Sequence, residues 1–126
     1  MVVWIAVGGA FGTLARYGLG GWVHGWAGSQ FPWGTLIVNV VGCLFVGFAM
    51  RALPGLPVSA EVRGMLTVGF AGGFTTFSTF GWETLALLQR GDWARAFLYA
   101  LGSMALGLAA VFAGWALGSS FLHARG

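Results

Sequence analysis

Charged residues are rare along the chain, and they divide it into long uncharged runs. The six basic residues are all arginines, and only three residues are acidic. The intervals 17–50, 64–82 and 96–124 contain no charged side chain. Each is longer than the ~18 apolar residues that mark a membrane-spanning helix. This pattern predicts an integral membrane protein.

Turn signals divide the chain further. They are GSQFP at 28–32, LPGLP at 53–57 and QRGDW at 89–93. We expect four helices, at about residues 2–26, 33–53, 60–89 and 93–121. All three connections are short, so successive helices should run antiparallel. The prediction is an all-α membrane protein with four transmembrane helices in a single domain, residues 1–126.

Composition supports this class and excludes others. The chain is 58% hydrophobic and 7% charged, against roughly 25% charged residues in soluble domains. Its pI is near 10.0, but scattered arginines form no basic cluster of the kind that binds nucleic acid. The N-terminal run lacks the basic start and cleavage pattern of a signal peptide, so we interpret it as a membrane span.

Basic residues are almost equally divided between the two predicted sides of the membrane. With four spans, Arg51, Arg63 and Arg125 share one side, while Arg90 and Arg95 share the other. The positive-inside rule then gives almost no preferred orientation. Insertion in both orientations would permit an antiparallel homodimer, although another feature could still fix a single topology.

The segment 69–83 combines features that a plain membrane helix lacks. It reads GFAGGFTTFSTFGWE, with a glycine pair, four hydroxyl side chains and regularly spaced phenylalanines. Glycine weakens a helix by about 1 kcal/mol relative to alanine, and hydroxyls can bond loosened backbone. We therefore expect a break in mid-membrane at Gly72 and Gly73, whose freed carbonyls can hold a cation. The alternative is an ordinary helix whose hydroxyls bond its own carbonyls.

Two polar residues lie inside otherwise apolar helices. An arginine such as Arg16 costs about 3 kcal/mol at the membrane centre on insertion scales, so it should face protein or water. It could attract an anion at the mouth of a pathway, or it could be structural. Asn39 lies near the middle of the second predicted helix, where its NH2 group could donate to a passing anion. Such an amide could equally bond a neighbouring helix.

Aromatic residues and further polar residues could extend this pathway. Phe74, Phe77 and Phe80 share one face if the segment is helical, and their ring edges attract anions weakly. Tyr99 and Ser103 lie one turn apart on the fourth predicted helix. Ordinary packing explains a phenylalanine stripe equally well, so both interpretations stay open.

Enzyme signatures are missing from the chain. It contains no HExxH, GxSxG or Walker motif and no paired carboxylates. Glu83 is either an interfacial acid or a group at a pathway mouth, and the other two acids give little material for acid–base catalysis. The single Cys43 allows no intramolecular disulfide. We expect no enzymatic activity.

Three segments together resemble the Fluc (CrcB) fluoride channel family. They are GGAFGTLARY at 8–17, GTLIVNVVG at 34–42 and GFAGGFTTFSTF at 69–80. The third is the most specific, and similarity of spacing and hydropathy covers essentially the whole chain. The resemblance implies an antiparallel, dual-topology homodimer in the plasma (inner) membrane of a prokaryote, with two fluoride pores and a central structural Na+.

The resemblance also implies roles for individual residues. Backbone carbonyls of Gly72 and Thr75 from each subunit would hold the Na+, and Arg16 matches an arginine near the vestibule. The implied pore residues are Asn39, Phe77, Ser78, Thr79, Phe80, Glu83, Tyr99 and Ser103. One turn beyond Ser103, where many relatives continue a hydroxyl track, this chain has Gly107.

The implied activity is passive, fluoride-selective conduction that exports fluoride from the cytoplasm. Fluoride is strongly hydrated, so conduction needs donors that replace water without binding the ion too tightly. The alternative is a small dual-topology, proton-coupled multidrug antiporter, which would need an ionisable acid deep in the membrane. The expected partners are fluoride, a second copy of the chain and membrane lipid, with no nucleic acid.

Overall fold

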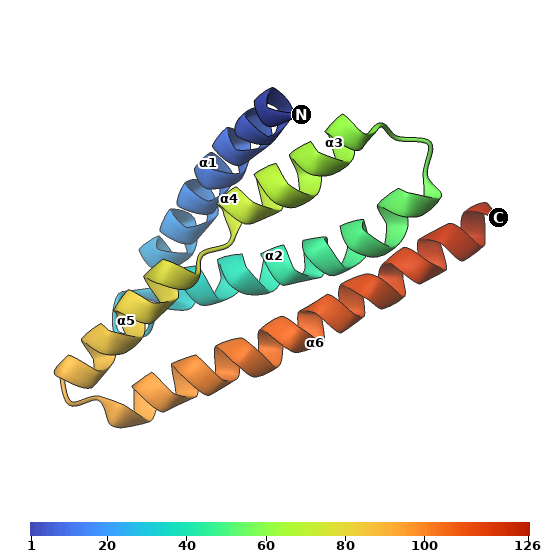
Figure 1. The fold of residues 1–126 in the computed structure, drawn as a ribbon. Coiled ribbons are helices and arrows are strands. Elements are labelled where there is room, and N and C mark those ends of the chain that lie inside the picture. The colour runs from blue at the N-terminus through green and yellow to red at the C-terminus, as the bar shows by residue number, and fades with distance from the viewer.

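The structure, a computed structural model, describes all residues 1–126 and is built from helices and short connections (Figure 1). The elements are α1 (Val2–Ala27), α2 (Trp33–Ala52), the 3-10 turn η1 (Leu53–Gly55), α3 (Ala60–Gly64), η2 (Met65–Ala71), α4 (Gly72–Phe74), α5 (Phe77–Gln89) and α6 (Trp93–Arg125). The η2 segment is wound as a π-helix. The predicted all-α class is confirmed.

Three segments are long and apolar enough to cross a membrane. They are Val2–Ala27, Trp33–Gly55 and Trp93–Arg125, which correspond to the first, second and fourth predicted helices. The last continues to Arg125 rather than ending near residue 121. The predicted third helix is divided among α3, η2, α4 and α5, so it does not form one continuous span.

The helices form two neighbouring pairs. In Figure 1, α1 lies beside the run from α3 to α4, and α2 lies beside α6. The two pairs converge where α5 packs on α6 and diverge toward the N- and C-termini. The break between α4 and α5 lies where the pairs meet, so it is within reach of side chains from both α1 and α2.

Glycines bring the backbones of α2 and α6 into contact. A Cβ atom added at Gly114 would overlap the carbonyl oxygen of Leu44, and one added at Gly47 would overlap that of Val111. Small residues permit such close approach between helices in lipid, where no hydrophobic force drives them together. This pair therefore depends on residues that have no side chain.

The break in the predicted third helix falls at Thr75 and Thr76, not at Gly72 and Gly73. Both glycines are helical, whereas Thr75 (φ −88°, ψ 156°) and Thr76 (φ −146°, ψ 120°) are extended. A Cβ at Gly73 would lie 2.6 Å from the carbonyl oxygen of Gly9 in α1. Gly73 thus serves helix packing, and the β-branched threonines, which suit extended backbone, form the break.

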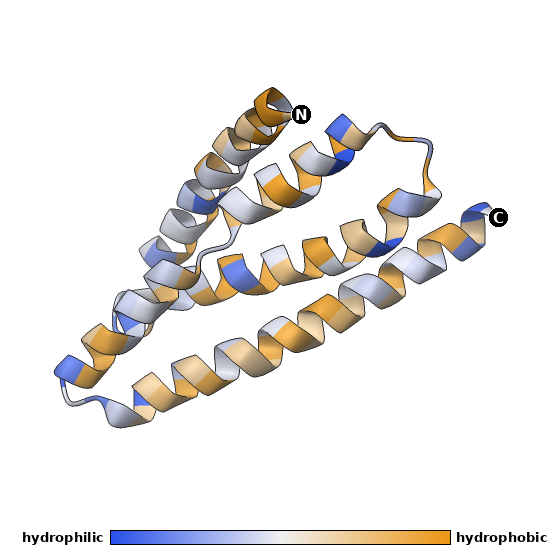
Figure 2. Ribbon diagram, viewed as in Figure 1, coloured by the Kyte–Doolittle hydropathy of each residue, from blue (hydrophilic) through white to orange (hydrophobic).

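Apolar side chains cover much of the outer surface. Only 21 of 126 residues are buried, and many large apolar side chains are exposed. Figure 2 shows hydrophilic positions near helix ends and also within α1 and α2, with α6 apolar along its middle. This distribution is that of a protein whose surroundings are lipid rather than water. The largest buried cluster, Leu36, Leu87, Ala96 and Tyr99, joins α2, α5 and α6.

Candidate functional site

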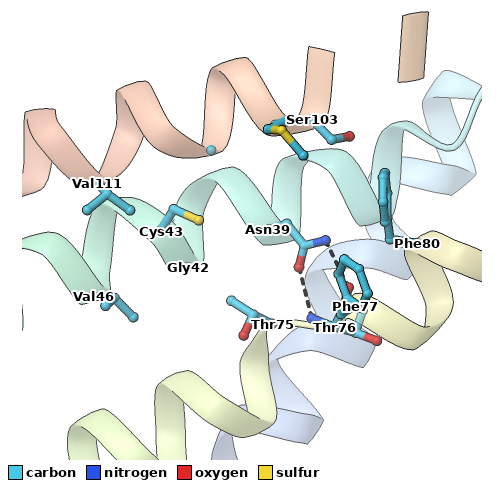
Figure 3. A pocket seen from close by; sticks show the side chains of 12 residues that line it. Asn39, Gly42, Cys43, Val46, Thr75, Thr76, Phe77, Phe80, Ser103 and Val111 are labelled. Atoms are coloured by element: carbon cyan, nitrogen blue, oxygen red, sulfur yellow. Dashed lines mark hydrogen bonds between the residues drawn. The ribbon is translucent and has the colours of Figure 1, made fainter. Parts of the chain in front are cut away.

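The side chain of Asn39 bridges the break between α4 and α5 (Figure 3). Its Nδ2 donates to the carbonyl oxygen of Thr76 (3.0 Å), and the Thr76 N–H donates to its Oδ1 (2.9 Å). One amide thus replaces both partners that a continuous helix would supply to this residue. Interior backbone in a membrane protein requires such replacement, because lipid supplies no hydrogen bonds.

Hydroxyl groups gather around Thr76 and begin the next helix. Thr76 Oγ1 accepts from the N–H of Thr79 (3.2 Å), which caps the N-terminus of α5. It also donates to Thr79 Oγ1 (3.1 Å), and Ser78 Oγ lies 3.4 Å away. Thr76 therefore connects the amide of α2 to the hydroxyls of α5.

Two carbonyls before the break are occupied. The oxygen of Ala71 accepts from the N–H (3.1 Å) and Oγ1 (3.0 Å) of Thr75. The oxygen of Gly73 accepts from Nε of Arg16 in α1 (3.1 Å). Arg16 is therefore tied to the broken backbone, and it has no acidic partner, since the one ion pair of the chain joins Arg95 and Asp92.

Three carbonyl oxygens at the break receive no hydrogen bond within the chain. They belong to Gly72, Phe74 and Thr75. Two of the donors that would reach them in a helix are redirected: the Thr76 N–H donates to Asn39 instead of Gly72, and the Thr79 N–H donates to Thr76 Oγ1 instead of Thr75. Carbonyls left without donors need another partner, such as water or a cation. Gly72 and Thr75 are the two residues at which the family resemblance implied a cation.

A cavity of about 340 Å³, here the first cavity, opens on one side of the break. It is lined by Asn39, Gly42, Cys43 and Val46 of α2, by Thr75, Thr76, Phe77 and Phe80 at the break, and by Ser103, Met104, Gly107 and Val111 of α6. Figure 3 shows these side chains converging from the three segments. The lining is mostly apolar, with few polar groups, as in many ligand-binding sites.

The two phenylalanines of the first cavity are placed differently. Phe80 packs against the buried ring of Tyr99, with centroids 5.1 Å apart. Phe77 is 84% exposed, and its centroid lies 5.7 Å from that of Phe80. The Phe80 ring is thus held by packing in the protein interior, whereas the Phe77 ring is exposed on the surface of the chain.

Cys43 occupies the part of the first cavity opposite Gly107. It lies one helical turn beyond Asn39, on the same face of α2. A Cβ added at Gly107 would lie 3.5 Å from Cys43 Sγ. Beside it on α6, Ser103 Oγ is buried without a hydrogen-bond partner. A thiol therefore stands where the sequence suggested that the polar track is interrupted.

A second cavity, of about 310 Å³, lies on the other side of the break. It is lined by Arg16, Tyr17, Gly20, Gly21 and His24 of α1, by Pro32, Gly34, Thr35 and Val38, and by Thr76, Thr79 and Glu83. Glu83 Oε1 accepts from the hydroxyl of Tyr99 (2.9 Å), which is otherwise buried. Thr76 lines both cavities.

The structure divides the predicted pore residues between these cavities. Asn39, Phe77, Phe80 and Ser103 line the first cavity, and Thr79 and Glu83 line the second together with Arg16. Ser78 lines neither cavity, and Tyr99 reaches the second only through its bond to Glu83. Of the two expected cation-binding residues, Thr75 lines the first cavity and Gly72 lines neither.

Sequence reasoning did not assign a role to Thr76, Cys43 or His24. Thr76 is the most important omission, because it bonds Asn39 twice and lines both cavities. A signal for it did exist: Asn39 carries both a donor and an acceptor, and a broken helix exposes both a carbonyl and an N–H. For Cys43 and His24, the sequence carried no such signal.

Most polar side chains that line these cavities can donate hydrogen bonds, and Glu83 is the one carboxylate among them. Hydroxyl, amide and guanidinium groups supply donors, and no group of three His, Cys, Asp or Glu side chains could hold a metal ion. Free carbonyls at the break provide acceptors of the kind that hard cations use. Fold and site together define a multi-pass helical membrane protein with a cavity on each side of a broken helix, and each cavity has some polar groups in its lining.

Comparison with known proteins specifies the family. Residues 3–115 match the family model described as CrcB-like protein, Camphor Resistance (CrcB), and the chain belongs to this family. It is 50% identical over 118 residues to a Fluoride-specific ion channel FluC from Thermus thermophilus, covering 94% of this chain and 93% of the relative. It is 52% identical over 111 residues to the protein of that name from Geobacter sulfurreducens, covering 87% and 90%.

Proposed function

We propose that this protein is a passive fluoride channel that lets fluoride leave the cytoplasm. The observation that carries the proposal is the pair of cavities, each with hydrogen-bond donors in its lining, that share Thr76 at the helix break. Fluoride could pass from the second cavity, beside Arg16, to the first cavity, beside Phe77 and Phe80. The names of the relatives, Fluoride-specific ion channel FluC, support fluoride as the ion.

The donors along this route suit a small anion. Each hydroxyl can rotate its O–H toward an ion, and ring edges add weak attraction. Arg16 lies at the second cavity and raises the local anion concentration. The ion would thus exchange water for weak donors in sequence, which permits entry without trapping. Thr79, Ser78 and Ser103 add further hydroxyls to the route, and Glu83 and Tyr99, which are hydrogen-bonded to each other, are its other members.

Backbone carbonyls at the break would hold a structural Na+. The oxygens of Gly72 and Thr75 receive no hydrogen bond from the chain, whereas their neighbours Ala71 and Gly73 do. Two oxygens from one chain are too few to surround a hard cation. A second copy related by a two-fold axis would double the number. The Na+ would supply only positive charge, which would hold together the helix breaks of the two copies.

This arrangement requires an antiparallel homodimer with four crossings per chain and one pore in each half. The nearly balanced arginines permit insertion in both orientations. The exposed ring of Phe77 would then be covered by the partner. Bacterial relatives support the inner membrane of a prokaryote. Nothing favours the antiporter, since the relatives are named as ion channels.

Ion efflux from liposomes tests the proposal. Purified protein should release fluoride rapidly and chloride negligibly, as read by ion-selective electrodes, without a proton gradient. Phe80→Ile should slow fluoride strongly, because it removes a ring edge from the first cavity. Equal chloride flux, or fluoride flux that depends on a proton gradient, would contradict the channel.

Replacing Na+ by a large organic cation should weaken the dimer, and sodium flux coupled to fluoride would contradict a structural ion.

A further inference from the structure

The last turns of α6 carry a group of polar side chains that the proposed fluoride route does not use. Ser119, Ser120 and His123 line a surface hollow of about 520 Å³. Arg51, in the last turn of α2, does not line the hollow itself but adjoins it, because its Nε donates to Ser119 Oγ (2.9 Å). Figure 2 shows hydrophilic positions at both of these helix ends. We call Arg51, Ser119, Ser120 and His123 the terminal cluster.

The Arg51 side chain is held in place by α6. A Cβ at Gly118 would lie 3.0 Å from the Cβ of Arg51, so the arginine stem lies against α6 where only glycine leaves room. The guanidinium carbon lies 5.7 Å from the centre of the Trp115 ring, a cation–π arrangement. With the bond to Ser119, these contacts fix the orientation of the guanidinium, so binding would require little further ordering.

The positive charge of Arg51 has no counterion in the chain. The one ion pair, between Arg95 and Asp92, lies at the opposite end of α6. Only Nε of Arg51 donates to an acceptor of the protein, so its two terminal amino groups are free to donate. A planar guanidinium with two such groups matches a phosphate, which can accept both hydrogen bonds.

The terminal cluster is surrounded by exposed apolar side chains and by Arg125, whose guanidinium carbon lies 5.9 Å from the centre of the Phe121 ring. Trp115, Leu117 and Phe121 of α6 are 54%, 55% and 38% exposed. Tryptophan is enriched at the membrane–water interface, where lipid phosphates lie. A phosphate reaching this cluster would therefore arrive on a lipid with its acyl chains along α6, rather than from bulk water.

We propose that the terminal cluster binds the phosphodiester group of an anionic lipid. Arg51 donates two hydrogen bonds to the phosphate, while Ser120 and His123 provide further donors from the hollow. Basic pockets between membrane helices suit such headgroups. This site is separate from the fluoride route, and its binding can be measured without any ion flux.

Lipid binding to the full-length protein in detergent tests this site. Phosphatidylglycerol, phosphatidylcholine with the same acyl chains, and inorganic phosphate would be titrated separately, with bound lipid counted by native mass spectrometry. Wild type should prefer phosphatidylglycerol, and Arg51→Gln should bind it about five-fold more weakly, as expected for one arginine contact. The matched control is Arg90→Gln, an exposed arginine beyond the other end of the bundle, which should retain wild-type binding.

Two further variants keep the test decisive if Arg51→Gln does not fold. Ser120→Ala and His123→Gln change exposed residues of the hollow and leave the Arg51 contacts intact. Each should weaken phosphatidylglycerol binding about two-fold. Equal binding of both lipids, or unchanged binding in all three variants, would overturn the proposal. Competition by millimolar inorganic phosphate with the same dependence on Arg51 would assign the site to free phosphate and overturn a lipid site.

Discussion

The two helix pairs of this protein use the same packing device but differ in their backbone. Glycines bring α2 against α6, and glycines such as Gly12 bring α1 against η2 and α4 in the same way. However, α2 and α6 are continuous helices, whereas the partner of α1 contains a π-helix and then a break. Close packing therefore holds both pairs together. Only the partner of α1, which contains the break, leaves backbone N–H and carbonyl groups free to bind other groups.

Polar side chains from both pairs compensate for this break. Asn39 of α2 satisfies the N–H and the carbonyl of Thr76, and Arg16 of α1 satisfies the carbonyl of Gly73. These two side chains, which the sequence marks as costly in lipid, are thus part of what makes the broken backbone tolerable. We therefore expect changes at the break to affect conduction and changes in the α2–α6 contact to affect stability.

The largest effect is expected from Asn39→Ala. The change removes two hydrogen bonds and leaves the N–H and carbonyl of Thr76 without partners. Each unsatisfied group costs about 1–3 kcal/mol, so the geometry shared by both cavities should be lost. We expect fluoride efflux from liposomes to fall about 100-fold, measured with an electrode on protein that remains folded by size-exclusion chromatography.

Thr84→Val is the matched control for Asn39→Ala. Thr84 Oγ1 donates to the carbonyl of Phe80 within α5 (2.8 Å), so its loss removes a polar contact beside the break without touching Thr76. Its efflux should stay near wild type. Near-normal efflux in Asn39→Ala would show that the amide is dispensable.

The next effect is on stability, from Gly114→Ala. The added methyl group would overlap the Leu44 carbonyl and push α6 away from α2. Overpacking of this kind destabilises by typically 1–3 kcal/mol, and we expect the free energy of unfolding in SDS titration to fall by about 2 kcal/mol. Gly21→Ala, on α1 with no atom within 4 Å of the new Cβ, should be neutral or slightly stabilising.

The two glycine variants also test the division of roles between the pairs. Because the α2–α6 contact is packing, folded Gly114→Ala should conduct fluoride at a rate much closer to wild type than Asn39→Ala does. If Gly114→Ala lost conduction without losing stability, the α2–α6 contact would contribute to conduction as well as to packing.

A smaller effect is expected from Arg16→Gln. Glutamine keeps a donor but removes the charge beside the second cavity and the fixed bond to Gly73. We expect fluoride efflux to fall about ten-fold, and the deficit to widen at low ionic strength, where electrostatic steering is stronger. Arg16→Lys should recover part of the rate, because it restores the charge without the guanidinium geometry. A full rate in Arg16→Gln would contradict this role.

The long helices and the existence of the break could be predicted from the sequence, whereas their contacts could not. Uncharged runs and turn signals predicted α2 and α6, and the apolar residues on both sides of Arg16 predicted α1, since length and hydropathy are local properties. The break was expected at Gly72 and Gly73 because glycine weakens an isolated helix. Contact with Gly9 of α1 overrides that local preference, and only the folded chain reveals it.

The candidate site was predicted residue by residue but not as an arrangement. Asn39, Phe80 and Ser103 do face one cavity, yet their distances depend on how α2, α5 and α6 cross. The pairing of Asn39 with Thr76 joins residues 37 positions apart, and no local pattern specifies it. The π-helix η2 was likewise unexpected, because it arises within a continuous helical run that packs on α1.

The smallest effect is expected from Gly107→Ser, which restores a hydroxyl where the sequence lacks one. The new Cβ would lie 3.5 Å from Cys43 Sγ, an ordinary contact, so the α2–α6 pair should accept it. If the Cys43 thiol already provides the polar group there, fluoride efflux should change less than two-fold. In a Cys43→Val background the same serine should accelerate efflux, because it then supplies the only donor of that layer. A large gain in the wild-type background would instead show that the thiol does not replace the missing hydroxyl.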